Sequence, residues 1–216
     1  MKKALASVFA VLVLPAAAQE MKKFDINCDA WAAGEVPAEV FVLDGKVSIA
    51  EKDGGKAIMI DPGTELVEAS AQLGDSAAGS AVIQTKVFAS KKGRSSPRFG
   101  ISVHGMNGPR LYVNPAKKQL ELVRGDQTLA SVPFAWASDA WLNLRLEAKK
   151  ADGDKWSVTG SVWGDKETAP ATPQIKHELT GLKGQGKCTL WATPYSNTPI
   201  YFDSIQIEVE AAAAAK

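Results

Sequence analysis

The clearest pattern in the chain is the alternation of apolar and polar residues near its C-terminus. From Ile205 to Glu210, isoleucine and valine alternate with glutamine and glutamate. Successive side chains of a strand point to opposite faces, so this pattern predicts an antiparallel strand with one buried face. The segments 141–147 and 156–163 have similar patterns. Turn residues such as Asp44-Gly45 separate further apolar runs, which favours hairpins.

These patterns predict about a dozen strands and no amphipathic helix beyond the N-terminal segment. So many strands without an internal repeat predict an all-β fold, a two-sheet antiparallel β-sandwich of the jelly-roll type, rather than a propeller or solenoid. We expect 164–186 to form a long loop. We expect strands at 24–28, 39–43, 46–49, 57–60, 65–71, 81–88, 98–104, 110–114, 119–124, 128–134, 141–148, 155–163, 187–192 and from about 200 to 210.

The N-terminus has a different pattern. Lys2 and Lys3 precede an apolar run from Ala4 to Leu14, and small residues follow up to Ala18. A basic segment, a short apolar segment and a small-residue site are typical of a secretory signal peptide. The apolar run is too short to span a bilayer. We therefore predict a signal peptide at 1–18, one β-sandwich domain at 19–210 and an Ala-rich tail at 211–216.

The net charge and the chain length limit the classes of function that this protein can have. Without Lys2 and Lys3, 23 basic residues stand against 24 acidic ones, so the formal net charge is −1. This balance gives no general attraction to nucleic acid or to anionic lipid. About 198 residues suit a single domain with its own core. We expect an exported monomer, periplasmic or extracellular, with no integral membrane anchor.

Two cysteines, Cys28 and Cys188, lie in the exported part. Each cysteine lies on the same face of its predicted strand as neighbouring apolar residues, so we expect both side chains to be buried. An oxidising compartment favours a disulfide between them. The alternative is a pair of buried free thiols that pack as small apolar residues.

A set of short segments along the chain forms a familiar pattern: 24–27, Trp31 with Gly34 and Pro37, 42–46, 98–101, 141–144, 186–191 and 201–207. In these segments the chain resembles the exported branch of the concanavalin A-like lectin/glucanase (laminin-G-like) jelly-roll superfamily. The resemblance implies that the first and last strands lie side by side. It also implies glycan-related functions, because the superfamily contains carbohydrate-binding modules, glucanases and sugar-processing domains.

Catalytic motifs are weak. A glucanase of this superfamily would carry two Glu with an Asp between them on one strand, because retaining chemistry needs two carboxylates close together. Glu208 and Glu210 lack that Asp and suit a solvated strand face. Glu65, Glu68 and Glu121 offer no better pair. We therefore assign no catalytic residue.

The two histidines, His104 and His177, have no Gly-x-Ser-x-Gly motif to support a nucleophilic triad. His104 follows the run that holds Ile101 and Val103, and we expect its side chain to point away from the core. His177 is expected near the end of the long loop, on the surface.

Aromatic and polar side chains suit a glycan site better, because sugars stack on aromatic rings and bond to fixed polar groups. If the strands near residues 112, 143 and 163 share a sheet, their polar faces would form one open surface. The candidate ligand-binding residues on that surface are Tyr112, Asn143, Arg145, Thr159, Trp163 and His104.

Asp203 breaks the alternation of the last strand, because its position places it with Ile205 and Ile207 on the apolar face. A buried carboxylate needs partners. Three explanations remain open: a β-bulge that turns Asp203 outward, capping by backbone N–H groups, or a structural Ca²⁺ held with Asp25 of the adjacent first strand. Calcium is the one cofactor we expect as a candidate.

The sequence therefore leaves three functions open. The first is an exported, non-catalytic carbohydrate-binding or cell-envelope accessory protein. The second is a glycoside-processing hydrolase of the same superfamily. The third is a protein-interaction module, which would show a large exposed apolar patch.

Overall fold

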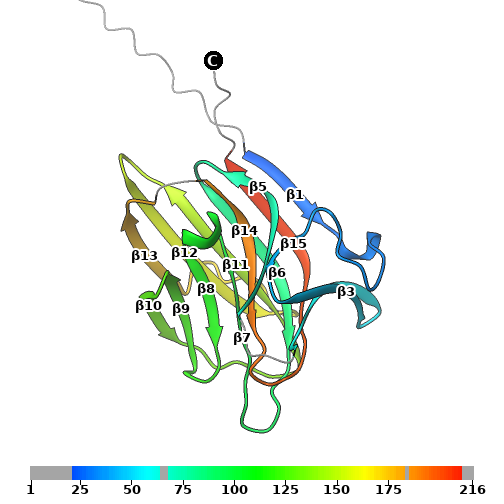
Figure 1. The fold of residues 1–216 in the computed structure, drawn as a ribbon. Coiled ribbons are helices and arrows are strands. Elements are labelled where there is room, and N and C mark those ends of the chain that lie inside the picture. The colour runs from blue at the N-terminus through cyan, green and yellow to red at the C-terminus, as the bar shows by residue number, and fades with distance from the viewer. Residues whose placement is uncertain (1–20, 64–67, 183–184, 211–216) are drawn as a thin grey trace, which may run out of the picture.

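Two antiparallel sheets make up the residues that the computed structural model describes, 21–63, 68–182 and 185–210. Figure 1 shows the two layers facing each other. This two-sheet β-sandwich confirms the predicted fold class. The predicted signal peptide and the Ala-rich tail lie outside the described residues.

Sheet A has eight strands in the described residues. In spatial order they are β13 (Ile175–Thr180), β12 (Lys155–Gly164), β11 (Ala140–Lys150), β6 (Ala81–Ala89), β15 (Ile200–Glu210), β4 (Gly55–Asp61) and β3 (Lys46–Lys52), with β1 (Met21–Ile26) paired to β15.

Sheet B has seven strands in the described residues. Their spatial order is β10 (Gln127–Pro133), β9 (Gln119–Arg124), β8 (Arg110–Asn114), β7 (Arg98–Ser102), β14 (Gly186–Thr193), β5 (Ala69–Ala77) and β2 (Phe41–Asp44). Two single 3₁₀ turns, η1 (Cys28–Ala30) and η2 (Gly105–Asn107), lie between strands.

The core lies between the two sheets. Ile205, Ile207 and Val209 of β15 are fully buried, as their alternation predicts, and they belong to one apolar cluster with Phe99 and Ile101 of sheet B. Apolar burial on this scale is the main favourable contribution to folding.

The first and last strands pair, as the resemblance implied. β1 runs antiparallel to the second half of β15, with Phe24 opposite Ile207. In Figure 1 the blue strand β1 lies beside the red strand β15. The first half of β15 pairs instead with β4, and the other edge of β15 pairs with β6 along most of its length. β15 therefore joins three other strands into one sheet.

A β-bulge in β15 explains Asp203. The pairing with β6 shifts between Asp203 and Gln206, and Ser204 has a φ of 51°. Phe202 and Ile205 are both fully buried, although two residues separate them. The bulge thus turns Asp203 and Ser204 to the outer face, which is the first of the three explanations offered above.

Thr85 of β6 completes the bulge. Its side chain is fully buried on the inner face, and its hydroxyl donates a hydrogen bond of 2.9 Å to the Asp203 carbonyl. A buried carbonyl without a donor would cost free energy. Thr85 is therefore the residue on β6 that satisfies the irregular backbone of β15.

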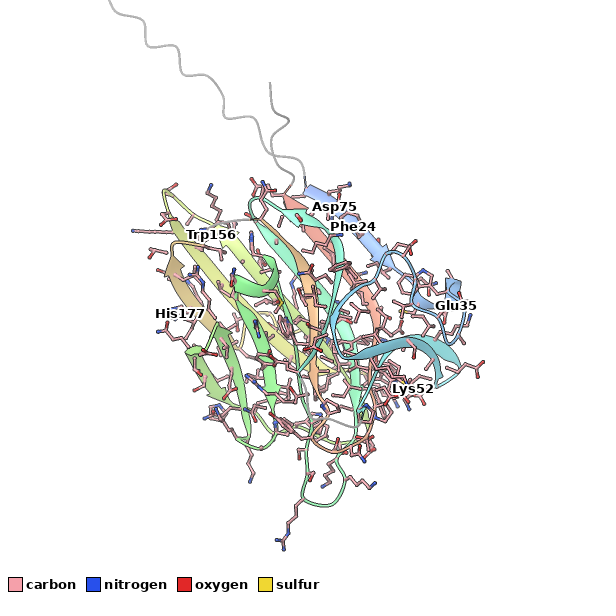
Figure 2. The ribbon with its side chains drawn as sticks, viewed as in Figure 1. Phe24, Glu35, Lys52, Asp75, Trp156 and His177 are labelled. Carbon is pink, nitrogen blue, oxygen red and sulfur yellow. The ribbon has the colours of Figure 1, made fainter. Side chains whose placement is uncertain are left out.

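The turn between β3 and β4 contacts aromatic side chains on the outer face of β6 and β11 in the same sheet. Lys52, labelled at the edge of the sandwich in Figure 2, places its Nζ 3.7 Å from the centre of the Phe88 ring. Next to it, Asp53 accepts a hydrogen bond of 2.8 Å from the indole nitrogen of Trp141. A cation on an aromatic face and a hydrogen bond to a carboxylate both stabilise this contact.

The segment 164–186 is not wholly a loop, so that prediction is wrong in part. Residues 175–180 form β13, which pairs with β12 at the edge of sheet A. Ile175 and Leu179 are buried on one face of this strand. The prolines and glycines of the segment suggested a loop, and the strand at its C-terminal half was missed.

The predicted disulfide is also wrong: Cys28 and Cys188 are free thiols in this structure. The Sγ atom of Cys28 in η1 lies 3.9 Å from the carbonyl oxygen of Phe202 in sheet A. Cys188 lies on β14 of sheet B, opposite Leu73. Both side chains are fully buried and belong to the same apolar core cluster. Burial raises the pKa of each thiol to about 12, and for Cys28 the Asp203 carboxylate adds to the effect.

The bulge gives a stability prediction. Thr85→Val keeps the shape of the side chain but removes the donor to the Asp203 carbonyl. We expect the free energy of unfolding to fall by about 1 to 3 kcal/mol, measured by urea denaturation. Thr180→Val, on an exposed position of β13, is the matched control and should change the stability by less than about 0.5 kcal/mol. Equal effects of both substitutions would contradict the role of Thr85.

Candidate functional site

The predicted ligand-binding residues do not share one face. Asn143 and Arg145 of β11 lie beside Trp163 and Ser161 of β12 on the outer face of sheet A. Thr159 lies further along β12, opposite Glu147. Tyr112 lies on β8 of sheet B. The condition that the strands near residues 112, 143 and 163 share a sheet is therefore not met, because β8 belongs to sheet B whereas β11 and β12 belong to sheet A.

His104 lies inside the sandwich, so its predicted outward orientation is wrong. His104 is 6% exposed, and the centres of its ring and of the Trp156 ring lie 5.2 Å apart in an edge-to-face arrangement. The alternation of β7 ends at Ser102, and His104 has a left-handed φ of 60°. That backbone conformation turns the ring inward. Burial lowers the pKa of His104 below its ordinary value.

The outer face of sheet B carries a hollow of about 500 Å³. Because the inner positions of β7, β8 and β9 are apolar, the alternate positions of these central strands project charged and polar groups into the hollow. The side chains used below are Glu68, Arg98, Arg110, Tyr112, Asn114 and Glu121.

The floor of this hollow depends on Gly100. Gly100 of β7 lies between Tyr112 of β8 and Trp191 of β14 in register. A Cβ at this position would clash with the carbonyl oxygen of Leu111 and with the Tyr112 ring. Glycine therefore permits the two large rings to pack on either side of β7.

Two arginines cover these rings. The Cζ atom of Arg98 lies 3.7 Å from the centre of the Tyr112 ring, and that of Arg110 lies 3.6 Å from the centre of the Trp191 ring. Stacking of a guanidinium on an aromatic face is favourable. The Trp191 indole nitrogen also donates a hydrogen bond of 2.8 Å to the Ser102 hydroxyl. Both rings are almost fully buried, so they form a rigid base for the charged groups above.

Two carboxylates, Glu68 and Glu121, line the hollow beside the arginines. Glu68, which precedes β5, accepts a hydrogen bond of 2.7 Å from the Tyr112 hydroxyl and one of 3.3 Å from Arg110. Glu121 of β9 accepts bonds of 2.8 Å from Lys117 and 3.1 Å from Asn114. Each carboxylate is thus held in place by at least two donors.

The ionisation of this network follows from its contacts. Burial acts to raise the pKa of Glu121, but the bonds from Lys117 and Asn114 and the charges of Lys117 and Arg98 outweigh it, so its pKa is below the ordinary value. Burial and the Glu68 carboxylate raise the pKa of Tyr112. A general acid needs a raised carboxyl pKa. Glu121 is therefore suited to accept hydrogen bonds as an anion rather than to donate a proton.

Tyr195 supplies an open aromatic ring at the same hollow. It is 49% exposed and lies on the segment between β14 and β15. Sequence reasoning missed it because it lies outside any strand alternation. The flanking Pro194 and Pro199 were the available signal, since they mark an exposed loop. Arg98 and Glu121 were missed as partners of each other because they lie on β7 and β9, which β8 separates in the sheet.

Trp163 borders a second hollow, of about 650 Å³, at the end of β11 and β12. Trp141, Glu167 and Gln174 also line it. Glu167 accepts a bond from the Gly164 amide, and Gln174 accepts one from Val162. Both of these side chains therefore bond to the backbone of β12.

Asp25 and Asp203, the predicted calcium ligands, both line a hollow of about 320 Å³ beside Asn27 and Asp29. Within the described residues, no three His, Cys, Asp or Glu side chains come together so as to hold a metal ion. The bulge already accounts for Asp203. Calcium at this place stays a prediction.

Exposed apolar side chains gather in one segment. Val36, Phe41 and Leu43 are the exposed large apolar residues on and before β2, at the edge of sheet B. Separately, the described residues contain no helix with the length and hydropathy needed to cross a membrane.

Comparison with known proteins gives structural relatives. No protein-family model matches the sequence, and no curated protein matches it. The carbohydrate binding module CBM66 from Bacillus subtilis superposes with a TM-score of 0.53 at 12% identity, covering 78% of this chain and 94% of that one. The CBM2 module of the evolved Dit of Lactobacillus casei BL23 phage J-1 gives 0.54 at 12%, over 90% and 99%.

The lectin UEA-II complexed with galactose gives a TM-score of 0.53 at 8% identity, covering 89% of this chain and 99% of that one. Identities this low show the fold alone. This chain therefore has a β-sandwich fold that carbohydrate-binding modules and lectins share.

The network predicts a pH-dependent effect of Glu121→Gln. Because the folded-state pKa of Glu121 is lowered, its ionised form stabilises the fold above the unfolded-state pKa of about 4.3, and this contribution is lost as the pH falls through the folded-state pKa. We expect the substitution to cost about 1 to 3 kcal/mol at neutral pH and much less near pH 3, by urea denaturation.

Glu178→Gln is the matched control, because Glu178 forms an exposed pair with Lys176. It should change the stability by less than about 0.5 kcal/mol at either pH. A cost for Glu121→Gln that is the same at both pH values would contradict the assignment.

Proposed function

We propose that this protein is an exported, non-catalytic carbohydrate-binding protein of the concanavalin A-like superfamily, with its glycan site in the hollow on sheet B. The observation that carries the proposal is the combination in one hollow of a half-exposed ring, Tyr195, with a fixed set of charged donors and acceptors. The fold shared with carbohydrate-binding modules and lectins supports it.

The hollow suits a sugar on chemical grounds. Sugar rings present C–H faces that stack on aromatic rings, and their hydroxyls both donate and accept hydrogen bonds. Tyr195 offers the ring, and the carboxylate of Glu121 and the amide of Asn114 lie at hydrogen-bonding distance from each other on β9 and β8. Because these polar groups are held by neighbouring strands, little conformational entropy is lost when a ligand orders them.

The proposal is tested with Tyr195→Ala. Loss of a stacking contact should weaken binding to a polysaccharide by about tenfold or more, measured by affinity electrophoresis and calorimetry against a panel of soluble polysaccharides. Phe41→Ala is the control, because Phe41 is exposed but lies outside the hollow. Its binding should equal that of the unsubstituted protein.

Three results would contradict the proposal. Binding to no polysaccharide would remove the function. Loss of binding in Trp163→Ala with none in Tyr195→Ala would move the site to the hollow at the end of β11 and β12. Release of reducing sugar from a bound polysaccharide would show a glycoside-processing enzyme instead.

Export is tested separately. If the signal peptide is cleaved near Ala18, the protein recovered from the medium or periplasm of an expressing bacterium should begin at or within a few residues of Gln19. Intact mass spectrometry measures this directly. A mass that retains residues 1–18 would contradict export by this route.

A further inference from the structure

We propose that the hollow on sheet B selects neutral sugars and rejects acidic ones, because its central cation, Arg98, is already shared between two carboxylates. The inference rests on the proposed function of the same hollow and names the class of glycan that it takes.

Arg98 is the group with unused hydrogen-bonding capacity. Its guanidinium nitrogens lie 3.7 Å from Glu68 and 3.6 Å from Glu121, within ion-pair range but beyond a hydrogen bond. Its Nε is buried and has no hydrogen-bond partner among the described residues. Stacking on Tyr112 fixes the plane of the guanidinium. The terminal nitrogens of Arg98, which lie beyond hydrogen-bond distance of both carboxylates, are the donors that can bond to oxygen atoms of a ligand.

The charges around Arg98 are balanced. Three cations, Arg98, Arg110 and Lys117, line the hollow together with three anions, Glu68, Glu121 and Asp126. Ion pairs connect most of them: Arg110 with Glu68, and Lys117 with Glu121. The hollow therefore has no excess positive charge to attract an anionic ligand from solution.

An acidic sugar would meet two carboxylates at the position of the free donors. A ligand carboxylate or sulfate bound to Arg98 would lie close to both Glu68 and Glu121, and like charges at such distances repel. Displacing Glu121 instead would break its ion pair with Arg98 and leave a carboxylate that is only 2% exposed with Lys117 as its remaining cation. Both routes cost free energy that contact with Arg98 alone does not offset.

A neutral sugar meets no such cost. A hydroxyl oxygen accepts a hydrogen bond from Arg98 while its hydrogen is donated to a neighbouring carboxylate. Neighbouring hydroxyls on a sugar ring could thus bridge Arg98 to Glu68 or to Glu121 without any change of net charge. Hydrogen bonds with a charged partner are stronger than those between neutral groups, so the bridged arrangement is favourable.

The test compares matched polysaccharides that differ in charge. The probes are hydroxyethylcellulose with carboxymethylcellulose, agarose with carrageenan, and galactomannan with alginate, measured by affinity electrophoresis and calorimetry. We expect binding to at least one neutral probe, and binding about tenfold or more weaker to its acidic counterpart. Raising the salt concentration should change neutral binding by less than about twofold, since no net charge is neutralised.

Two variants test the residues. Arg98→Met should weaken neutral binding by about tenfold or more, while Arg94→Met, in the exposed loop before β7, should leave it unchanged. Glu68→Gln removes one negative charge but keeps an acceptor for the Tyr112 hydroxyl. It should raise binding of the acidic probes by about tenfold relative to the neutral ones. Thermal unfolding of each variant verifies that it folds.

The outcomes separate the two proposals. Acidic probes that bind the unsubstituted protein as tightly as neutral ones would overturn the selectivity while the proposed function stands. A neutral preference that Glu68→Gln leaves unchanged would overturn the role given to the carboxylates. Binding to none of the probes would overturn the proposed function and the selectivity together.

Discussion

The register of β15 is the constraint on which both halves of sheet A depend. This strand pairs with β6 on one edge and with β4 and then β1 on the other. Side chains alternate with a period of two, so a register error of one residue would turn Ile205, Ile207 and Val209 to solvent. The bulge at Asp203 and Ser204 supplies the extra residue that keeps Phe202 and Ile205 both inside. Thr85 satisfies the backbone carbonyl at that point.

In sheet B the corresponding constraint is that Gly100 carries no side chain. Gly100 leaves room for Tyr112 and Trp191 to flank β7, and these rings in turn hold Arg98 and Arg110 flat on the outer face. Any larger residue at Gly100 would push against the backbone of β8. The charged groups of the hollow are therefore positioned by packing rather than by their own pairing, which is how a binding site gains a fixed geometry.

The sequence predicted the local features of this fold better than the site. Alternation located most strands, and the break at Asp203 located the irregularity of β15 while leaving a bulge as one of three explanations, because both signals depend on neighbouring residues. The site depends on contacts between distant segments. Glu68 meets Arg110 across 42 positions, and no local pattern encodes that approach. The disulfide prediction failed for the same reason: parity shows that Cys28 and Cys188 are buried, but it does not show that their sulfur atoms meet.

Stability alone does not account for the charged hollow. Ion pairs at a surface contribute little, about 0 to 1 kcal/mol each, and burying a carboxylate as deeply as Glu121 carries a desolvation cost that its partners must first offset. Apolar side chains could cover Tyr112 and Trp191 at less cost. Instead, Arg98 keeps a buried Nε without a hydrogen-bond acceptor among the described residues, beside an open aromatic ring at Tyr195. Under the proposed function, a ligand would accept hydrogen bonds from Arg98 and stack on Tyr195, and this would account for a charged network that stability alone does not explain.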